Sequence, residues 1–238
     1  MTLQHQRVLI IGGTSGIGLG VATAVAERGG TPIVVSRNQS SVDRALGALP
    51  AGAHGATVDL TDTAAIEALA EDIGPVDHLV YTAGEPLEAV PLAELTPAVI
   101  SGFYQTRFVS ACITVRVFGP RLPATGSITL TSGSASEQPE FGALPVSLCG
   151  AMNALTTALA VELAPVRVNA VAPGVVRSPL WRNLDDGDRE ALYSSTAEQT
   201  PVGRIGEVND AAQAYLYCIE QKFSTGAVIK VDGGSVLV

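Results

Sequence analysis

Short runs of apolar, largely β-branched residues recur along the chain and alternate with longer stretches of helical periodicity. The apolar runs predict seven strands, at residues 7–11, 31–36, 54–60, 77–83, 126–132, 166–173 and 227–233. The helical patterns lie between them, at residues 18–29, 63–73, 97–118, 146–163 and 208–220. Because the strands are almost continuously apolar, we expect helices on both faces of their sheet. The pattern predicts a doubly wound α/β fold with one seven-stranded parallel sheet and right-handed crossovers.

One domain over residues 1–238 is expected, because no linker or internal repeat divides the chain. Residues 178–200 fit the alternation poorly. They are acidic, carry Trp181 and Tyr193, and follow the end of a predicted strand. Two interpretations stay open: a substrate flap over a cleft, or a surface pair of helices with no catalytic role.

Composition narrows the class of protein. A hydrophobic content of 47% excludes a disordered chain, and the net charge of −9 argues against a nucleic-acid surface, which needs clustered Lys and Arg. The cysteines are three and widely spaced, which suits a reducing compartment, and the histidines show no ligand spacing, so no metal site is expected. The apolar runs are shorter than a membrane span needs. We expect a cytoplasmic protein with no membrane or nucleic-acid partner.

A glycine-rich segment, VLIIGGTSGIGLG, follows the first predicted strand and opens the first helix. Its residues Gly12, Gly16 and Gly18 allow a tight turn and a close approach of the backbone to a pyrophosphate, which the helix N-terminus attracts. The spacing differs from the common G-x-G-x-x-G pattern, so a turn that binds nothing is the alternative. The strand–turn–helix context favours dinucleotide binding.

The second predicted strand ends in Ser36, Arg37 and Asn38. An NAD site needs a carboxylate at this point to accept a hydrogen bond from the ribose 2′-hydroxyl, whereas a cation fits the 2′-phosphate of NADP. Arg37 offers a planar guanidinium with no acid close in sequence. An exposed loop arginine is the alternative, but the position favours NADP(H).

With these residues in place, the chain resembles the short-chain dehydrogenase/reductase family over nearly its full length. The matching segments, in order, are GGTSGIG, VDL, TAG, ITLTSG, VRVNAVAPGVVRSPL and STGAVIKVDGG. The resemblance implies a Rossmann-type fold and a homodimer or homotetramer. It also implies an NADP(H) site made by Gly12, Thr14, Ser15, Gly16, Ile17, Gly18, Ser36, Arg37, Asn38, Asp59, Leu60, Ala83, Gly84, Pro173, Gly174, Val176 and Ser178.

The chain departs from the family in the residues that carry its chemistry. The family uses a serine, a tyrosine with a lysine four residues later, and an asparagine on the preceding long helix. Ser132 matches the serine, while Pro145 and Cys149 stand at the tyrosine and lysine positions, and Arg107 at that of the asparagine. No shift of register restores the pair, because residues 105–192 contain neither a tyrosine nor a lysine.

Three functions stay open. The first is an NADP(H)-dependent oxidoreductase acting on a small carbonyl or alcohol, with Ser132 and Arg107 as catalytic residues. For Ser132 a capping role at the strand end is the alternative, and for Arg107 an interface salt bridge. The second function is an NADP(H)-binding partner subunit or sensor without turnover, and the third is a non-redox enzyme that uses the same cleft.

Overall fold

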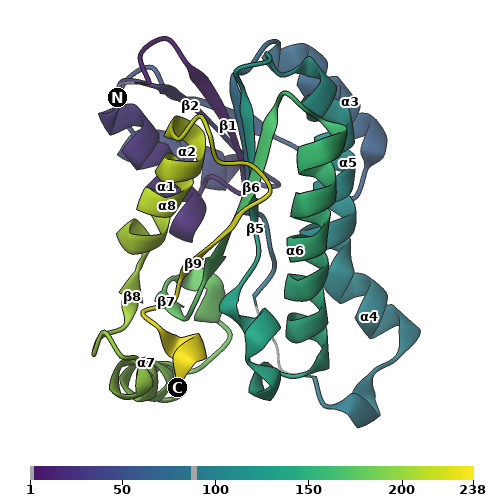
Figure 1. Ribbon diagram of the computed structural model, residues 1–238. Coiled ribbons are helices and arrows are strands. Elements are labelled where there is room, and N and C mark those ends of the chain that lie inside the picture. The colour runs from purple at the N-terminus through teal and green to yellow at the C-terminus, as the bar shows by residue number, and fades with distance from the viewer. Residues whose placement is uncertain (1–2, 87–89) are drawn as a thin grey trace.

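A seven-stranded parallel sheet forms the centre of the molecule in the computed structural model, which describes residues 3–86 and 90–238 (Figure 1). Its strands are β1 (Arg7–Ile11), β2 (Thr31–Ser36), β3 (His54–Thr57), β4 (His78–Tyr81), β5 (Ser127–Thr131), β6 (Arg167–Pro173) and β9 (Val228–Val231). They lie in the order β3-β2-β1-β4-β5-β6-β9. The order reverses between β1 and β4, and a crevice forms at the carboxyl ends of strands where it does so. The predicted fold class is confirmed.

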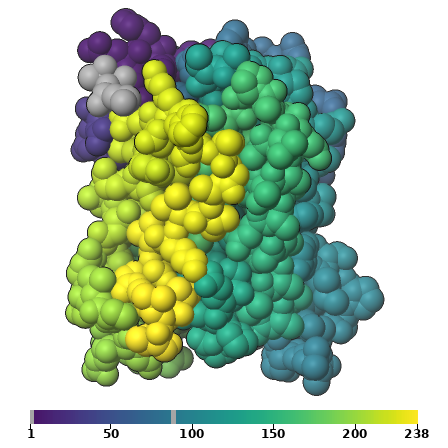
Figure 2. Space-filling view, viewed as in Figure 1, coloured from purple at the N-terminus to yellow at the C-terminus, as the bar shows by residue number. Residues whose placement is uncertain are grey.

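Helices cover both faces of the sheet. They are α1 (Gly16–Glu27), α2 (Gln39–Ala48), α3 (Thr63–Ile73), α4 (Pro97–Tyr104), α5 (Ser110–Phe118), α6 (Ala143–Glu162), α7 (Asp186–Gln199) and α8 (Val208–Glu220). One core cluster joins the sheet to α1, α2 and α8, and the other joins it to α3, α5 and α6 (Figure 1). The C-terminal residues pack beside α6 on the face seen in Figure 2.

Alternation along β1 explains the two clusters. Val8 and Ile10 point into the cluster with α1 and α8, whereas Leu9 and Ile11 point into the one with α3, α5 and α6. All four side chains are fully buried. Each such burial contributes about 1.5–3 kcal/mol, so a strand that is apolar at every position is stabilised from both sides.

The structure corrects several predicted elements. The helix predicted over residues 97–118 is α4 and α5 joined by a π-helical turn at Gln105–Val109. The helix α2, in which only Val42 and Ala45 are buried, was missed. The helix α7, in which only Tyr193 is buried, lies in the segment 178–200, for which surface helices were one of the two open interpretations. So few buried positions leave almost no periodicity to detect. A small second sheet pairs β7 (Val176–Arg177) with β8 (Gly206–Glu207).

His78 is buried at the start of β4. Its Nδ1 lies 2.8 Å from Ser127 Oγ and its Nε2 lies 3.2 Å from Gln6 Oε1. Burial, together with the positive charge of Arg167, lowers the pKa of His78 to about 4, and nearby Asp77 opposes the shift. The folded protein therefore holds a neutral imidazole over a pH range in which the unfolded chain protonates it.

This depressed pKa predicts a loss of stability in mild acid. Below pH ~6.5 His78 of the unfolded chain binds a proton, whereas His78 of the folded protein binds it only near pH 4. The free energy of unfolding therefore falls by about 2 kcal/mol between pH 7.5 and 5 because of this group alone. Denaturant unfolding of His78→Gln should show a pH slope smaller by that amount. His54→Gln, at an exposed position on β3, is the matched control and should keep the slope of the unmodified protein. Equal slopes for all three proteins would contradict the assignment.

Candidate active site

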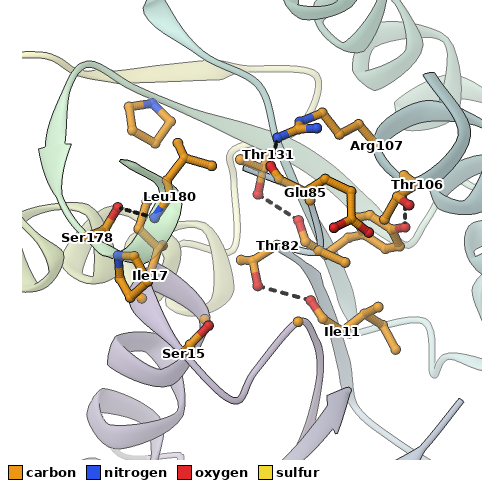
Figure 3. A pocket seen from close by; sticks show the side chains of 18 of the residues that line it. Ile11, Ser15, Ile17, Thr82, Glu85, Thr106, Arg107, Thr131, Ser178 and Leu180 are labelled. Carbon is orange, nitrogen blue, oxygen red and sulfur yellow. Dashed lines mark hydrogen bonds between the residues drawn. The ribbon is translucent and has the colours of Figure 1, made fainter. Parts of the chain in front are cut away.

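A cleft of about 640 Å³ opens beyond the carboxyl ends of the central strands. Every residue predicted to bind cofactor, from Gly12 to Ser178, lines it, and so do Ser132 and Arg107. Figure 3 shows Ser178 and Leu180 on one side of this space and Arg107 with Glu85 on the other. Segments far apart in the sequence therefore meet at the switch point of the sheet.

The turn between β1 and α1 has no room for side chains at two glycines. A Cβ on Gly12, where φ is +83°, would lie 2.6 Å from the backbone nitrogen of Ala83. A Cβ on Gly18 would lie 2.2 Å from the carbonyl oxygen of Gly12 and 2.5 Å from Thr82 Oγ1. Thr82 is itself tied to β1, since its Oγ1 donates to the Ile11 carbonyl at 3.0 Å (Figure 3). The turn is thereby held against the end of β4.

The first turn of α1 presents backbone N–H groups to the cleft. Ser15 precedes the helix but its side chain caps none of these groups, and the first turn carries no acidic residue. Ser15, Gly16 and Ile17 all line the cleft. Uncapped donors at the positive end of a helix dipole fit a phosphate. The donor set and the close glycine turn therefore fit the pyrophosphate of a dinucleotide.

Two guanidinium groups line the far end of this phosphate site. Arg37 is exposed at the end of β2 and makes no hydrogen bond or ion pair with a described residue. Arg44, which the sequence analysis missed, joins it from α2. Ser41 and Arg44 both line the cleft and stand three residues apart, so they share a face of α2. Had α2 been predicted from the sequence, this spacing would have placed Arg44 on the helix face that carries Ser41.

Asp59 lies close enough to Arg37 for its charge to act on the carboxylate, and it is fixed by the residue two positions later. Its Oδ1 accepts hydrogen bonds from the backbone N–H of Thr61 at 2.9 Å and from Thr61 Oγ1 at 2.7 Å. These bonds, with a smaller effect from the charge of Arg37, lower the pKa of Asp59. The carboxylate is thus ionised at neutral pH and held in one orientation by Thr61.

Ser132 follows β5 and is held by α6. Its Oγ donates to Asn153 Oδ1 at 2.6 Å and to the Cys149 carbonyl at 3.1 Å. Asn153 Nδ2 in turn donates to Ser136 Oγ at 3.3 Å. Asn153, also missed in the sequence analysis, lies one helical turn beyond Cys149 and thus on the same face of α6. The hydroxyl at the end of β5 is therefore oriented by a side chain far from it in sequence.

Arg107 lies in the π-helical turn and reaches the cleft beside Gly84. Its guanidinium donates to the carbonyl of Glu85 and stands 5.3 Å from the centre of the Phe103 ring. Burial lowers the pKa of Arg107, and the Glu85 carboxylate opposes that shift. No carboxylate of the described chain pairs with it within 4.0 Å. Since an arginine stays charged at neutral pH, the cleft holds a partly desolvated cation with N–H donors to spare.

Pro145 and Cys149 line the cleft from the first two turns of α6. Proline is tolerated there because a first-turn N–H has no helical partner. Burial raises the pKa of the Cys149 thiol, with Ser132 and the charge of Arg107 opposing the shift. The thiol therefore stays neutral, and neither side chain offers an acid that titrates near neutral pH.

Only the first part of the segment 178–200 lines the cleft within the described residues. Ser178, Pro179, Leu180, Trp181 and Arg182 form this wall, whereas α7 lies outside it. Ser178 Oγ accepts a hydrogen bond from the Leu180 backbone N–H at 3.4 Å (Figure 3). The Trp181 indole N–H donates to the Val176 carbonyl at 3.0 Å, which fixes the ring against the end of β7.

Comparison with known sequences covers almost the whole chain. The profile of the SDR-like Rossmann domain matches residues 2–238. The short-chain dehydrogenase/reductase malC of Malbranchea aurantiaca is 34% identical over an alignment of 253 positions that covers 99% of this chain and 96% of the relative. The galactitol 2-dehydrogenase (L-tagatose-forming) of Cereibacter sphaeroides is 34% identical over 245 residues, covering 94% of this chain and 92% of the relative.

Two solved structures are similar over nearly their full length. The MalC reductase/Diels-Alderase of Malbranchea aurantiaca superposes with a TM-score of 0.91 at 32% identity, covering 99% of this chain and 98% of that one. An NADPH-bound short chain oxidoreductase of Pseudomonas aeruginosa PAO1, which contains an atypical catalytic center, gives a TM-score of 0.90 at 29% identity, covering 98% and 97%.

The glycine turn predicts opposite effects of two glycine-to-alanine substitutions. Gly18→Ala should lower the free energy of unfolding by about 1–3 kcal/mol, because the added methyl overlaps backbone that cannot move aside. Gly47→Ala is the matched control in α2, where a Cβ meets nothing within 4 Å, and should raise it by roughly 0.5–1 kcal/mol. Chemical denaturation of both variants measures the difference. A stable Gly18→Ala variant would show that the turn relaxes freely.

Proposed function

Since this chain belongs to the short-chain dehydrogenase/reductase family, we propose that it is an NADP(H)-dependent oxidoreductase interconverting a carbonyl and an alcohol. Its active site is atypical, with Pro145 and Cys149 at the positions of the family's tyrosine and lysine. The observation that carries the proposal is a single cleft that joins the phosphate turn to Ser132 and Arg107. The NADPH-bound relative with an atypical catalytic center supports it.

Cofactor binding is assigned to residues that fit a phosphorylated dinucleotide. The backbone N–H groups of Gly16, Ile17 and Gly18 in the first turn of α1 would hold the pyrophosphate, and Arg37 with Arg44 would hold the 2′-phosphate. When bound, NADPH supplies the hydride, which is the chemically difficult part of the reaction. The remaining task of the chain is to orient the substrate and to stabilise charge on its oxygen.

The missing tyrosine removes the usual proton donor. A positioned acid or base is worth about 10²–10⁴ in rate, or roughly 3–5 kcal/mol of barrier. Arg107 recovers part of this by donating hydrogen bonds to the substrate oxygen as negative charge grows on it, and Ser132 adds a second donor when its hydroxyl turns from Asn153 to that oxygen. Arg107 acts through its charge, because a guanidinium does not release a proton at neutral pH. The oxygen then takes its proton from water.

Two other functions have observations in their favour. The absence of an acid at Pro145 and Cys149 favours an NADP(H)-binding sensor or partner subunit without turnover. The MalC relative is named both a reductase and a Diels-Alderase, which favours a non-redox cyclisation in the same cleft as the third possibility. Only the leading proposal requires consumption of NADPH.

NADPH consumption with a panel of ketones and aldehydes separates these functions. Oxidation that depends on one class of carbonyl compound supports the oxidoreductase. NADPH binding by calorimetry without oxidation across the panel would favour the sensor, and conversion without added nicotinamide would favour the non-redox enzyme. A failure to bind NADPH at all would remove the basis of the first two.

Self-association and a cytoplasmic location also stay predictions. By length and composition α6 could span a bilayer, but its buried residues contact the core of the domain. Elsewhere it exposes small residues, namely Gly150, Ala154 and Ala158. Small residues let another helix approach closely, so we propose α6 as the face of a homodimer or homotetramer, which sedimentation of the native protein can check.

The segment 178–200 is proposed as the substrate flap.

Arg37 predicts a preference for the phosphorylated cofactor. Arg37→Ser should weaken NADPH binding about 10–100-fold and leave NADH binding nearly unchanged, because only NADPH carries the 2′-phosphate that the guanidinium would pair with. Calorimetry with both cofactors measures this. Arg116→Ser is the control, since Arg116 pairs with Glu67 away from the cleft. An equal loss for both cofactors would instead indicate a general disturbance of the turn.

Ser132 and Arg107 predict losses in turnover rather than in cofactor affinity. Ser132→Ala should lower kcat about 10²–10³-fold with little change in NADPH affinity, because it removes a donor aimed at the developing oxyanion. Arg107→Leu should lower kcat similarly, and Arg107→Lys should recover part of it by restoring the charge. The control is Ser101→Ala, at an exposed position of α4. Unchanged kcat in Ser132→Ala would exclude the role assigned to this hydroxyl.

A further inference from the structure

Apolar side chains line the wall of the cleft near Ser132. Phe141, Pro145 and Leu148 line it from the side of α6, and Leu180 and Trp181 line it from the segment after β7. The polar atom of Trp181 is already used, because its indole N–H donates to the Val176 carbonyl. The ring therefore presents an apolar surface to whatever lies against it. From this composition we infer that the substrate is an apolar, ring-bearing ketone rather than a sugar or a polyol, an inference that rests on the proposed oxidoreductase function.

Hydrogen-bond acceptors are scarce at this end of the cleft. The two guanidinium groups there, Arg107 and Arg182, can only donate. The lining hydroxyls of Ser134 and Ser178 are neutral acceptors, of which Ser178 already accepts one bond from the Leu180 backbone N–H, and the Cys149 thiol is a weak partner. Among the described lining residues at this end, Glu85 supplies the one carboxylate, and it is exposed beside Arg107 rather than set into the apolar wall.

This imbalance selects against polyols. Each buried substrate hydroxyl brings an O–H donor, and a donor left without an acceptor weakens binding by about tenfold or more. A ketose carries several hydroxyls, so the losses multiply. A ketone with a hydrocarbon ring brings a single acceptor oxygen, which matches the unused N–H donors of Arg107. The named substrate of the galactitol 2-dehydrogenase relative is thus of a class that this wall disfavours.

Trp181 makes the inference directly measurable, because it is the sole tryptophan of the chain. The protein saturated with NADP⁺ is titrated with decalone, a bicyclic ketone, and in parallel with L-tagatose, a ketose. Oxidised cofactor prevents reduction of either ketone, and absorbance of NADPH at 340 nm reports any oxidation of an L-tagatose hydroxyl. Decalone should give a saturable change in tryptophan emission, with an affinity at least about tenfold above that of L-tagatose. A second arm repeats both ligands with NADPH and follows its oxidation.

Matched variants assign the binding to the apolar face of the ring. Trp181→Phe and Trp181→Gln both lose the bond to Val176, so they differ in whether an apolar ring remains. By calorimetry, decalone affinity should be nearly kept in Trp181→Phe and lowered about tenfold in Trp181→Gln. Unchanged NADPH affinity in both shows that they are folded. Phe223→Leu replaces an aromatic side chain that is 99% exposed outside the cleft, and should change nothing.

The two arms separate the substrate class from the redox function. Decalone binding with oxidation of NADPH supports both, and decalone binding without oxidation keeps the apolar class while removing the oxidoreductase proposal. Binding or reduction of L-tagatose equal to that of decalone overturns the substrate class and leaves the redox function standing. If neither ligand changes the tryptophan emission of protein that is shown to bind NADP⁺, the proposed substrate class is also overturned.

Discussion

The backbone of Gly18 lies so close to the carbonyl of Gly12 that no side chain fits between them, and the whole site depends on this contact. It brings the start of α1 against the end of β4, where Thr82 holds β1 and β4 in step. Because the sheet order reverses at this place, the loops after β1, β4 and β5 converge on one space. The first-turn amides of α1 and Ser132 thus line the same cleft.

The sequence predicted the sheet far better than the details of the site. Buried strands carry their signal in consecutive β-branched residues, so β1 and β2 begin and end where predicted. Arg44 and Asn153 were missed for a different reason. Arg44 lies on α2, whose periodicity is faint, and Asn153 acts on Ser132 through a hydrogen bond that spans 21 positions of the sequence. Such a bond exists only once tertiary packing has brought β5 and α6 together.

The two halves of the cleft are built from different physical elements. The nucleotide half relies on backbone amides, glycines and exposed guanidinium groups, which bind a fixed chemical group whatever the substrate. The other half relies on side chains of α6 and of the segment after β7, which the chain can exchange without disturbing the turn. Pro145 fits this division, because the proposed correspondence puts it at the position of a reactive side chain, in a first helical turn that tolerates proline. Binding and proton transfer are therefore separable properties of this scaffold.

The π-helical turn at Gln105–Val109 has a consequence for how the chain is compared with others. Such a turn holds one residue more than an α-helical turn, and each residue rotates a helix by about 100°. Loss of Gln105 or Thr106 would turn Arg107 by about that angle relative to α4, away from the direction in which it meets the cleft. The number of residues before α5 therefore decides whether the Arg107 guanidinium reaches the cavity. A sequence alignment without gaps to a helix that lacks this π-helical turn would place Arg107 on the wrong face of that helix.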